Sequence, residues 1–104
     1  THQGQHSFSE NYGIPPIGVC HADDIQYLWG VRNLSEIDEK VSKIMTTAWT
    51  SFAKFGDPSP PGTPFSWTPV DPNFSSRYFN ISGAEPSMDL SPDIRERMQL
   101  WFAF

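Results

Sequence analysis

The sequence predicts an α/β protein, and it predicts that these 104 residues are one part of a larger domain. Residues 35–55 carry the periodicity of a long amphipathic helix, whose apolar face needs a surface to cover. Residues 77–82 have the composition of a β-strand, but no other segment offers a convincing partner for them. Because a lone strand cannot satisfy its backbone donors and acceptors, we expect the rest of the sheet to lie upstream.

Length and charge limit the classes of protein to consider. A chain of 104 residues is enough for one small domain at most. Its formal net charge of -5 argues against a nucleic-acid partner and against an anionic membrane surface. No apolar run approaches the roughly 18 residues that a membrane span needs. The first residues have no signal-peptide core and no initiator Met, so we expect the chain to start inside a longer product.

The first thirty residues are predicted to be a loop followed by a short helix. Residues 1–20 are polar and then rich in Gly and Pro, which favours irregular structure. A helix is expected over about residues 22–29, with acidic residues at its positive end and Gly30 closing it. Its apolar face is expected to consist of Ile25, Leu28 and Trp29.

The long helix has recognisable ends. Ser35 followed by Asp38 is a capping-box pattern, and Gly56 with the Asp-Pro after it stops the helix. Between them, apolar residues recur at spacings of three and four and predict one buried stripe. Its members are Ile37, Val41, Ile44, Met45, Ala48, Trp49 and Phe52.

The remaining residues alternate between loop and regular structure. Residues 58–72 contain six of the ten prolines, which excludes regular structure there, and Phe65 and Trp67 are expected to pin this loop onto a surface. The strand at 77–82 follows. A final helix is predicted to begin with Ser91 as its cap and to carry aromatic residues to the end of the chain.

The cysteine and asparagine residues give an indication of the cellular compartment of the protein. Cys20 is the single cysteine, so an internal disulfide is impossible. The pattern Asn-x-Ser occurs at Asn33, Asn73 and Asn80, which makes these three residues candidate glycosylation sites. Three such patterns among four asparagines favour a secreted protein or a secretory route, with a cytoplasmic location as the open alternative.

The segment from Gly18 to Trp29 reads Gly-Val-Cys-His-Ala-Asp-Asp-Ile-Gln-Tyr-Leu-Trp. It resembles the histidine loop of the type-B carboxylesterase and cholinesterase family, which reads Gly-x-x-His-(Gly/Ala)-x-(Glu/Asp) before an apolar helix. The end of the long helix, Trp49 to Pro58, resembles the family's Trp-x-x-Phe-Ala-Lys-x-Gly-(Asp/Asn)-Pro. The two motifs together make the resemblance specific.

The resemblance covers nearly the whole chain in the family's order. Residues 67–69 are similar to its Trp-Pro element, residues 78–82 to its edge strand, and residues 95–104 to its last helix. Gly4 to Phe8 look like the strand that precedes the histidine loop in arthropod members.

This resemblance implies an α/β-hydrolase, of which residues 1–104 are the C-terminal segment: the histidine loop, packing helices and one edge strand. His21 would then be the catalytic histidine of a Ser-acid-His triad, and Asp24 would brace its loop. The chain has no Gly-x-Ser-x-Gly nucleophile motif, so the serine and the acid are expected upstream and the segment alone is expected to be inactive. The implied substrate is a small-molecule carboxylic ester, with no metal and no organic cofactor, and the implied partner is the remainder of the domain.

Other interpretations stay open at this point. The complete protein could be an esterase-like adhesion or binding domain without activity, or the 104 residues could be a truncated, non-enzymatic product. An isolated His21 would ordinarily be a loop or capping histidine. Cys20 beside it could be a reactive thiol or a metal ligand, although a small and partly buried residue is the simpler reading.

Overall fold

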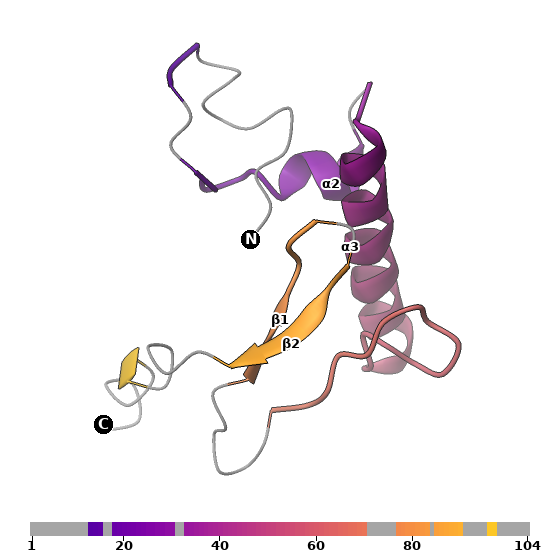
Figure 1. The fold of residues 1–104 in the computed structure, drawn as a ribbon. Coiled ribbons are helices and arrows are strands. Elements are labelled where there is room, and N and C mark those ends of the chain that lie inside the picture. The colour runs from indigo at the N-terminus through magenta and orange to yellow at the C-terminus, as the bar shows by residue number, and fades with distance from the viewer. Residues whose placement is uncertain are drawn as a thin grey trace.

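The computed structural model describes residues 13–15, 18–30, 33–70, 77–83, 85–90 and 96–97. Within these ranges the chain forms helix α2 (Ile25–Trp29), helix α3 (Glu36–Phe55), strand β1 (Arg77–Asn80) and strand β2 (Ser87–Leu90). Figure 1 shows α3 as the longest element, with α2 crossing it near its N-terminal end and the strand pair lying beside it. None of the described helices is long and apolar enough to cross a membrane.

Helix α3 begins and ends where the sequence predicts. The Ser35 hydroxyl accepts a hydrogen bond from the backbone N–H of Asp38 at 3.1 Å and donates one to the Asp38 carboxylate at 2.8 Å. At the other end Gly56 adopts a left-handed conformation with φ of 69°, and its N–H donates to the Phe52 carbonyl. Glycine adopts this conformation without the steric cost that a Cβ imposes, so the helix stops there.

The buried face of α3 is narrower than the predicted stripe. Val41, Ile44, Met45 and Ala48 are buried and form the core with residues of α2, the loop and the hairpin. The outer members of the stripe are about half exposed within this segment: Ile37 (51%), Trp49 (45%) and Phe52 (60%). The described elements are too few to cover the full apolar width of this helix.

Helix α2 differs from the prediction in its start and in its buried face. It begins at Ile25, because residues 21–24 form turns. Of the apolar face predicted from Ile25, Leu28 and Trp29, Leu28 is half-buried, whereas Trp29 is 83% exposed within this segment. The buried residues of the helix are Gln26 and Tyr27. The helix docks on α3 through Tyr27, whose backbone carbonyl accepts a hydrogen bond from the Ser42 hydroxyl at 2.6 Å.

The strand predicted at 77–82 does have a partner within this chain. Strand β1 pairs antiparallel with β2, with Arg77 opposite Leu90 and Asn80 opposite Ser87. The expectation of an unpaired strand was therefore wrong, and it no longer argues for missing structure. The error has a physical reason: the second strand is four residues long and contains Ser87 and Asp89, which are poor strand formers.

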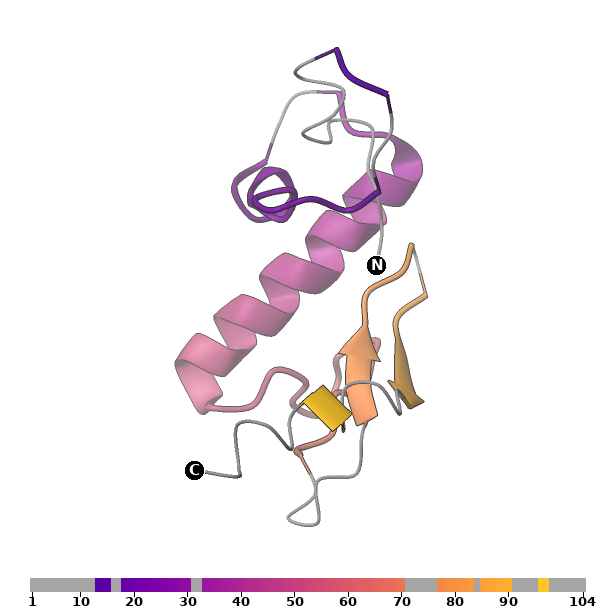
Figure 2. The ribbon, with the colours of Figure 1, turned by 90° about the vertical axis from the view of Figure 1, so that its left-hand side faces the viewer.

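The Pro-rich loop is anchored by the two aromatic residues predicted for that role. Phe65 is buried against Ile44 and Ala48 of α3, and the ring of Trp67 stacks on Phe79 of β1 with centroids 4.6 Å apart. In Figure 2 this loop runs from the C-terminal end of α3 toward the hairpin. The loop thus joins helix and hairpin into one apolar cluster, and the prediction that these two residues pin it onto a surface is confirmed.

Several predicted features lie outside the described residues. They include the polar first twelve residues, the resemblance at residues 4–8, the candidate site Asn73, and most of the helix expected from Ser91 onward. Of that last helix the structure describes Glu96 and Arg97, and both are helical.

Candidate functional site

His21 lies in a short turn that precedes α2. Residues 21–24 form consecutive turns, and His21 itself is exposed. An exposed imidazole is accessible to a group on another element, as a general base must be. The structure thus places the predicted catalytic residue on the surface, in the turn that leads into α2.

The turn is closed by the carboxylate of Asp23. The backbone N–H of Cys20 donates to Asp23 Oδ2 at 2.8 Å, and the backbone N–H of Asp23 donates to the Cys20 carbonyl at 3.3 Å. Asp23 is only 5% exposed, so its hydrogen bond is shielded from competing water. His21 and Ala22 are the two residues enclosed between these contacts.

Ala22 holds a backbone conformation that is unusual for its residue type. Its φ is 71°, in the left-handed region that residues with a Cβ avoid at a cost of about 1–2 kcal/mol. The Ala22 carbonyl accepts a hydrogen bond from the N–H of Ile25 at 3.2 Å, which leads into α2. The residue next to His21 therefore sets the sharp reversal, and it carries the smallest side chain that has a Cβ.

Gln26 ties the same turn to α2. Its side-chain nitrogen donates to the Asp23 carbonyl at 3.0 Å, in a buried position. The other polar atom of that amide, Oε1, is buried and has no hydrogen-bond partner among the described residues. A buried acceptor of this kind favours a donor from a neighbouring segment.

A second buried contact fixes α2 to α3. The Tyr27 hydroxyl donates to Asp38 Oδ1 at 3.3 Å, and both side chains are at least 97% buried. Burial raises the pKa of Tyr27, and the nearby carboxylates of Asp38 and Asp23 raise it further. Tyr27 therefore stays protonated and acts as a donor at neutral pH.

The resemblance implied that Asp24, and not Asp23, would brace this turn. Asp24 occupies the N-cap position of α2, but its side chain makes no capping hydrogen bond. The carboxylate that closes the turn belongs to Asp23, which the resemblance did not single out. Its spacing of three residues from Cys20 was a signal, because short acidic side chains often accept a hydrogen bond from a nearby backbone N–H.

Cys20 fits the simpler of its two readings. It is half-buried, and its thiol donates to the Gly18 carbonyl at 3.6 Å. Over the described ranges, no group of three His, Cys, Asp or Glu residues lies close enough together to hold a metal ion.

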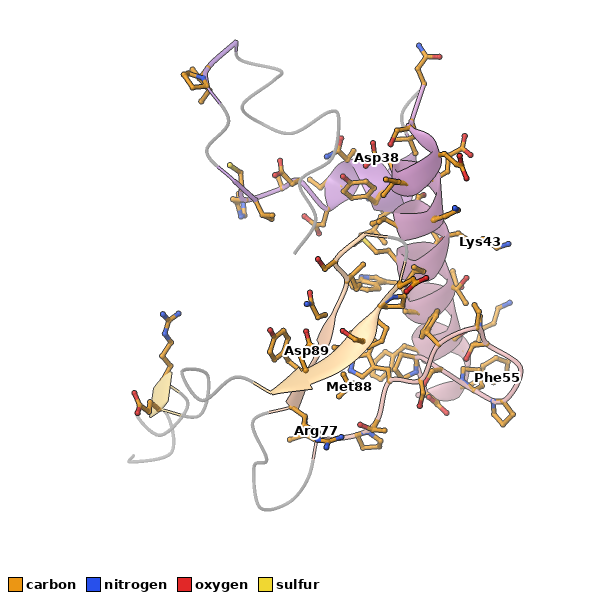
Figure 3. The ribbon with its side chains drawn as sticks, in the orientation of Figure 1. Asp38, Lys43, Phe55, Arg77, Met88 and Asp89 are labelled. Carbon is orange, nitrogen blue, oxygen red and sulfur yellow. The ribbon has the colours of Figure 1, made fainter. Side chains whose placement is uncertain are left out.

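The candidate glycosylation sites differ in their surroundings. Asn33 is exposed in a turn just before α3, with φ of 64°. Asn80 is half-buried, and its amide nitrogen, the atom that a glycan would occupy, donates to Asp89 Oδ2 at 2.7 Å. Figure 3 shows Asp89 on the hairpin, away from Asp38 at the α2–α3 crossing.

Comparison with known proteins agrees with the motifs around this turn. The model of the carboxylesterase family matches residues 1–101. The chain belongs to the carboxylesterase family. Membership implies an α/β-hydrolase fold, and the two helices and two-stranded sheet of the described residues are consistent with a piece of one.

The similar proteins are ester hydrolases by name. Bile salt-activated lipase of Rattus norvegicus is 32% identical over 93 residues, covering 82% of this chain and 15% of that protein. Bile salt-activated lipase of Homo sapiens is 35% identical over 86 residues, covering 76% and 11%. Acylcarnitine hydrolase of Rattus norvegicus is 27% identical over 101 residues, covering 91% and 17%. The chain thus spans less than a fifth of the length of these relatives.

Proposed function

We propose that this chain supplies the catalytic histidine of a carboxylic ester hydrolase, and that His21 is that residue. The observation that carries the proposal is the position of His21 at the exposed tip of a braced turn. Membership in the carboxylesterase family supports it, as do relatives named lipase and acylcarnitine hydrolase.

In the proposed mechanism His21 works as a general base and then as a general acid. It takes the proton of a serine hydroxyl as the serine attacks the ester carbonyl, and it returns the proton to the leaving alcohol. Imidazole suits both steps because its ordinary pKa lies near 6.5. Water then hydrolyses the acyl-enzyme in the same manner, so neither step requires a metal or an organic cofactor.

The serine and the acid of the triad are proposed to lie in the part of the protein that precedes this chain. In α/β-hydrolases the triad follows the order Ser, acid, His, which agrees with a histidine in a C-terminal segment. The isolated 104 residues should accordingly be inactive. The proposed substrates are small-molecule carboxylic esters.

Exposed apolar side chains support contact with the remainder of such a domain. On the described residues, Trp29 is 83% exposed, Phe55 is 69% exposed and Phe52 is 60% exposed. Large aromatic surfaces left open in this way usually mark contacts with other protein surface. We propose that the preceding part of the domain covers them.

We also propose a secretory location, in which Asn33 is a glycosylated residue. Asn33 is exposed in a turn, which favours access for a glycosyltransferase, whereas Asn80 is half-buried.

A direct test uses the native protein. An antibody against residues 35–55 would capture it. One portion of the captured protein would be treated with a fluorophosphonate probe, which labels activated serines, and a separate portion would be given an ester substrate. Labelling and hydrolysis are the expected results. A captured protein that neither reacts with the probe nor hydrolyses esters would favour the alternative, an esterase-like adhesion or binding domain.

A further inference from the structure

We infer that Asp23 is a positioning residue for His21: its buried carboxylate holds the Cys20 N–H and so fixes the direction of the histidine turn. This inference rests on the proposed function of His21. It assigns a role to a residue that the family motif leaves variable.

The geometry of the turn supports this role. The contact between Cys20 N–H and Asp23 Oδ2 measures 2.8 Å, which is short for an N–H donor and typical of a bond to a charged acceptor. It joins the residue before His21 to the residue two positions after it. Two backbone torsions at His21 and two at Ala22 are thereby confined between fixed ends.

The burial of Asp23 also supports this role. Asp23 is 5% exposed, although aspartates in folded proteins mostly lie at the surface. Burying a carboxylate is unfavourable unless hydrogen bonds compensate for the lost hydration. The burial of Asp23 two residues after an exposed histidine therefore supports its role as the acceptor that holds the turn.

Asp23 is itself held in place by a residue of α2. Gln26 Nε2 donates to the Asp23 carbonyl at 3.0 Å, and Gln26 is 8% exposed on α2. Through α2 the turn is connected to Tyr27 and Asp38, at the crossing with α3. The turn that carries the exposed imidazole is thus connected to α3 through buried contacts. This suits a group whose position must be fixed during proton transfer.

The experiment compares four variants of the full-length protein: D23A, D23N, D57A and H21A. D57A is the matched control, because Asp57 Oδ1 also accepts a backbone N–H, that of Ser59, at 2.8 Å, in an exposed loop. For each variant we would measure kcat and KM for a p-nitrophenyl ester, the rate and the end point of fluorophosphonate labelling, and Tm.

D23A should lower kcat and the labelling rate by about 100-fold, as a misplacement of about 1 Å does, with KM little changed. The labelling end point should remain complete, since every molecule still folds and reacts slowly. D23N keeps an acceptor oxygen and should lose less than about tenfold. D57A should match the wild type.

Two results would overturn the inference. One is a D23A protein with the kcat of D57A. The other is a D23A or D23N protein whose labelling rate is unchanged while its end point falls, which indicates lost folding and no positioning role. If D23A does not fold, D23N decides: a kcat and labelling rate below those of D57A, by up to about tenfold, support the inference, and a D23N protein with the kcat of D57A overturns it. An H21A protein with full activity would instead refute the proposed function, so the two failures are distinguishable.

Discussion

The hydroxyl of Tyr27 donates to Asp38 Oδ1 at 3.3 Å, between two side chains that are 3% and 1% exposed. Asp38 Oδ2 also accepts a hydrogen bond from the Ser35 hydroxyl at 2.8 Å, so one carboxylate takes part in both the helix cap and the helix crossing. Figure 3 places Asp38 where α2 meets the first turn of α3. The turn that carries His21 is therefore attached to the most regular element of the chain through buried polar contacts.

Removing the hydroxyl of Tyr27 should destabilise the protein. Y27F takes a donor from a buried carboxylate, and we expect a loss of about 2 kcal/mol in the free energy of unfolding, measured by urea denaturation. Y78F provides the control, since Tyr78 lies on β1 with 36% of its surface exposed. Equal midpoints for the two variants would show that the buried contact contributes nothing.

The same residue predicts a loss of stability at high pH. The pKa of Tyr27 is raised in the folded protein, mainly by burial and then by Asp38. Between the ordinary tyrosine pKa of about 10 and the higher folded value, the unfolded chain binds fewer protons than the folded one. The contribution of Tyr27 to the free energy of unfolding is thus constant below about pH 10. Above that pH it falls by at most about 1.4 kcal/mol per pH unit.

Urea unfolding at pH 8, 10 and 11 would measure this dependence. Y27F should show a smaller fall between pH 10 and 11 than the wild type, because it lacks the titrating group. Identical slopes for the two proteins would contradict the raised pKa.

Substitutions at Ala22 should separate backbone strain from side-chain size. A22G relieves the left-handed φ of 71° but frees the unfolded chain, so the net change in stability should stay within about 1 kcal/mol. A22V places a β-branched residue in that region, and we expect a loss of more than about 1 kcal/mol together with a lower kcat. Thermal unfolding and ester hydrolysis would be compared, and similar behaviour of A22V and A22G would contradict the assigned conformation.

Glycan occupancy should follow the surroundings of each asparagine. When the protein is expressed through a secretory host, treatment with an N-glycosidase should reduce its apparent mass. N33Q should reduce that shift by one glycan, while N80Q should leave it unchanged, because the Asn80 amide is bonded to Asp89. A shift lost in N80Q and kept in N33Q would reverse the assignment.

The features that the sequence predicts well depend on local physics. Helix α3 follows from a cap at Ser35, a period of three to four and a glycine at 56, and each of these acts within a few residues. The anchoring of Phe65 and Trp67 follows from large apolar rings inside a stretch that has no regular structure.

The features that the sequence does not predict depend on residues that are distant along the chain. The buried face of α2 is set by Tyr27 meeting Asp38, eleven residues later, and not by the hydrophobicity of α2 itself. Strand β2 forms because it pairs with β1, although β2 contains Ser87 and Asp89. At the site, His21 was predicted from a motif, whereas the role of Asp23 required the distance to Cys20.

The most direct test of the account is the replacement of His21 in the full-length protein. H21A should lower kcat for a p-nitrophenyl ester by roughly 10⁴-fold or more, because a serine without its base is a weak nucleophile. H6A, at another histidine of the same chain, should retain the wild-type rate. If H21A hydrolysed the ester as fast as H6A, His21 would not be the catalytic histidine and the account would be wrong.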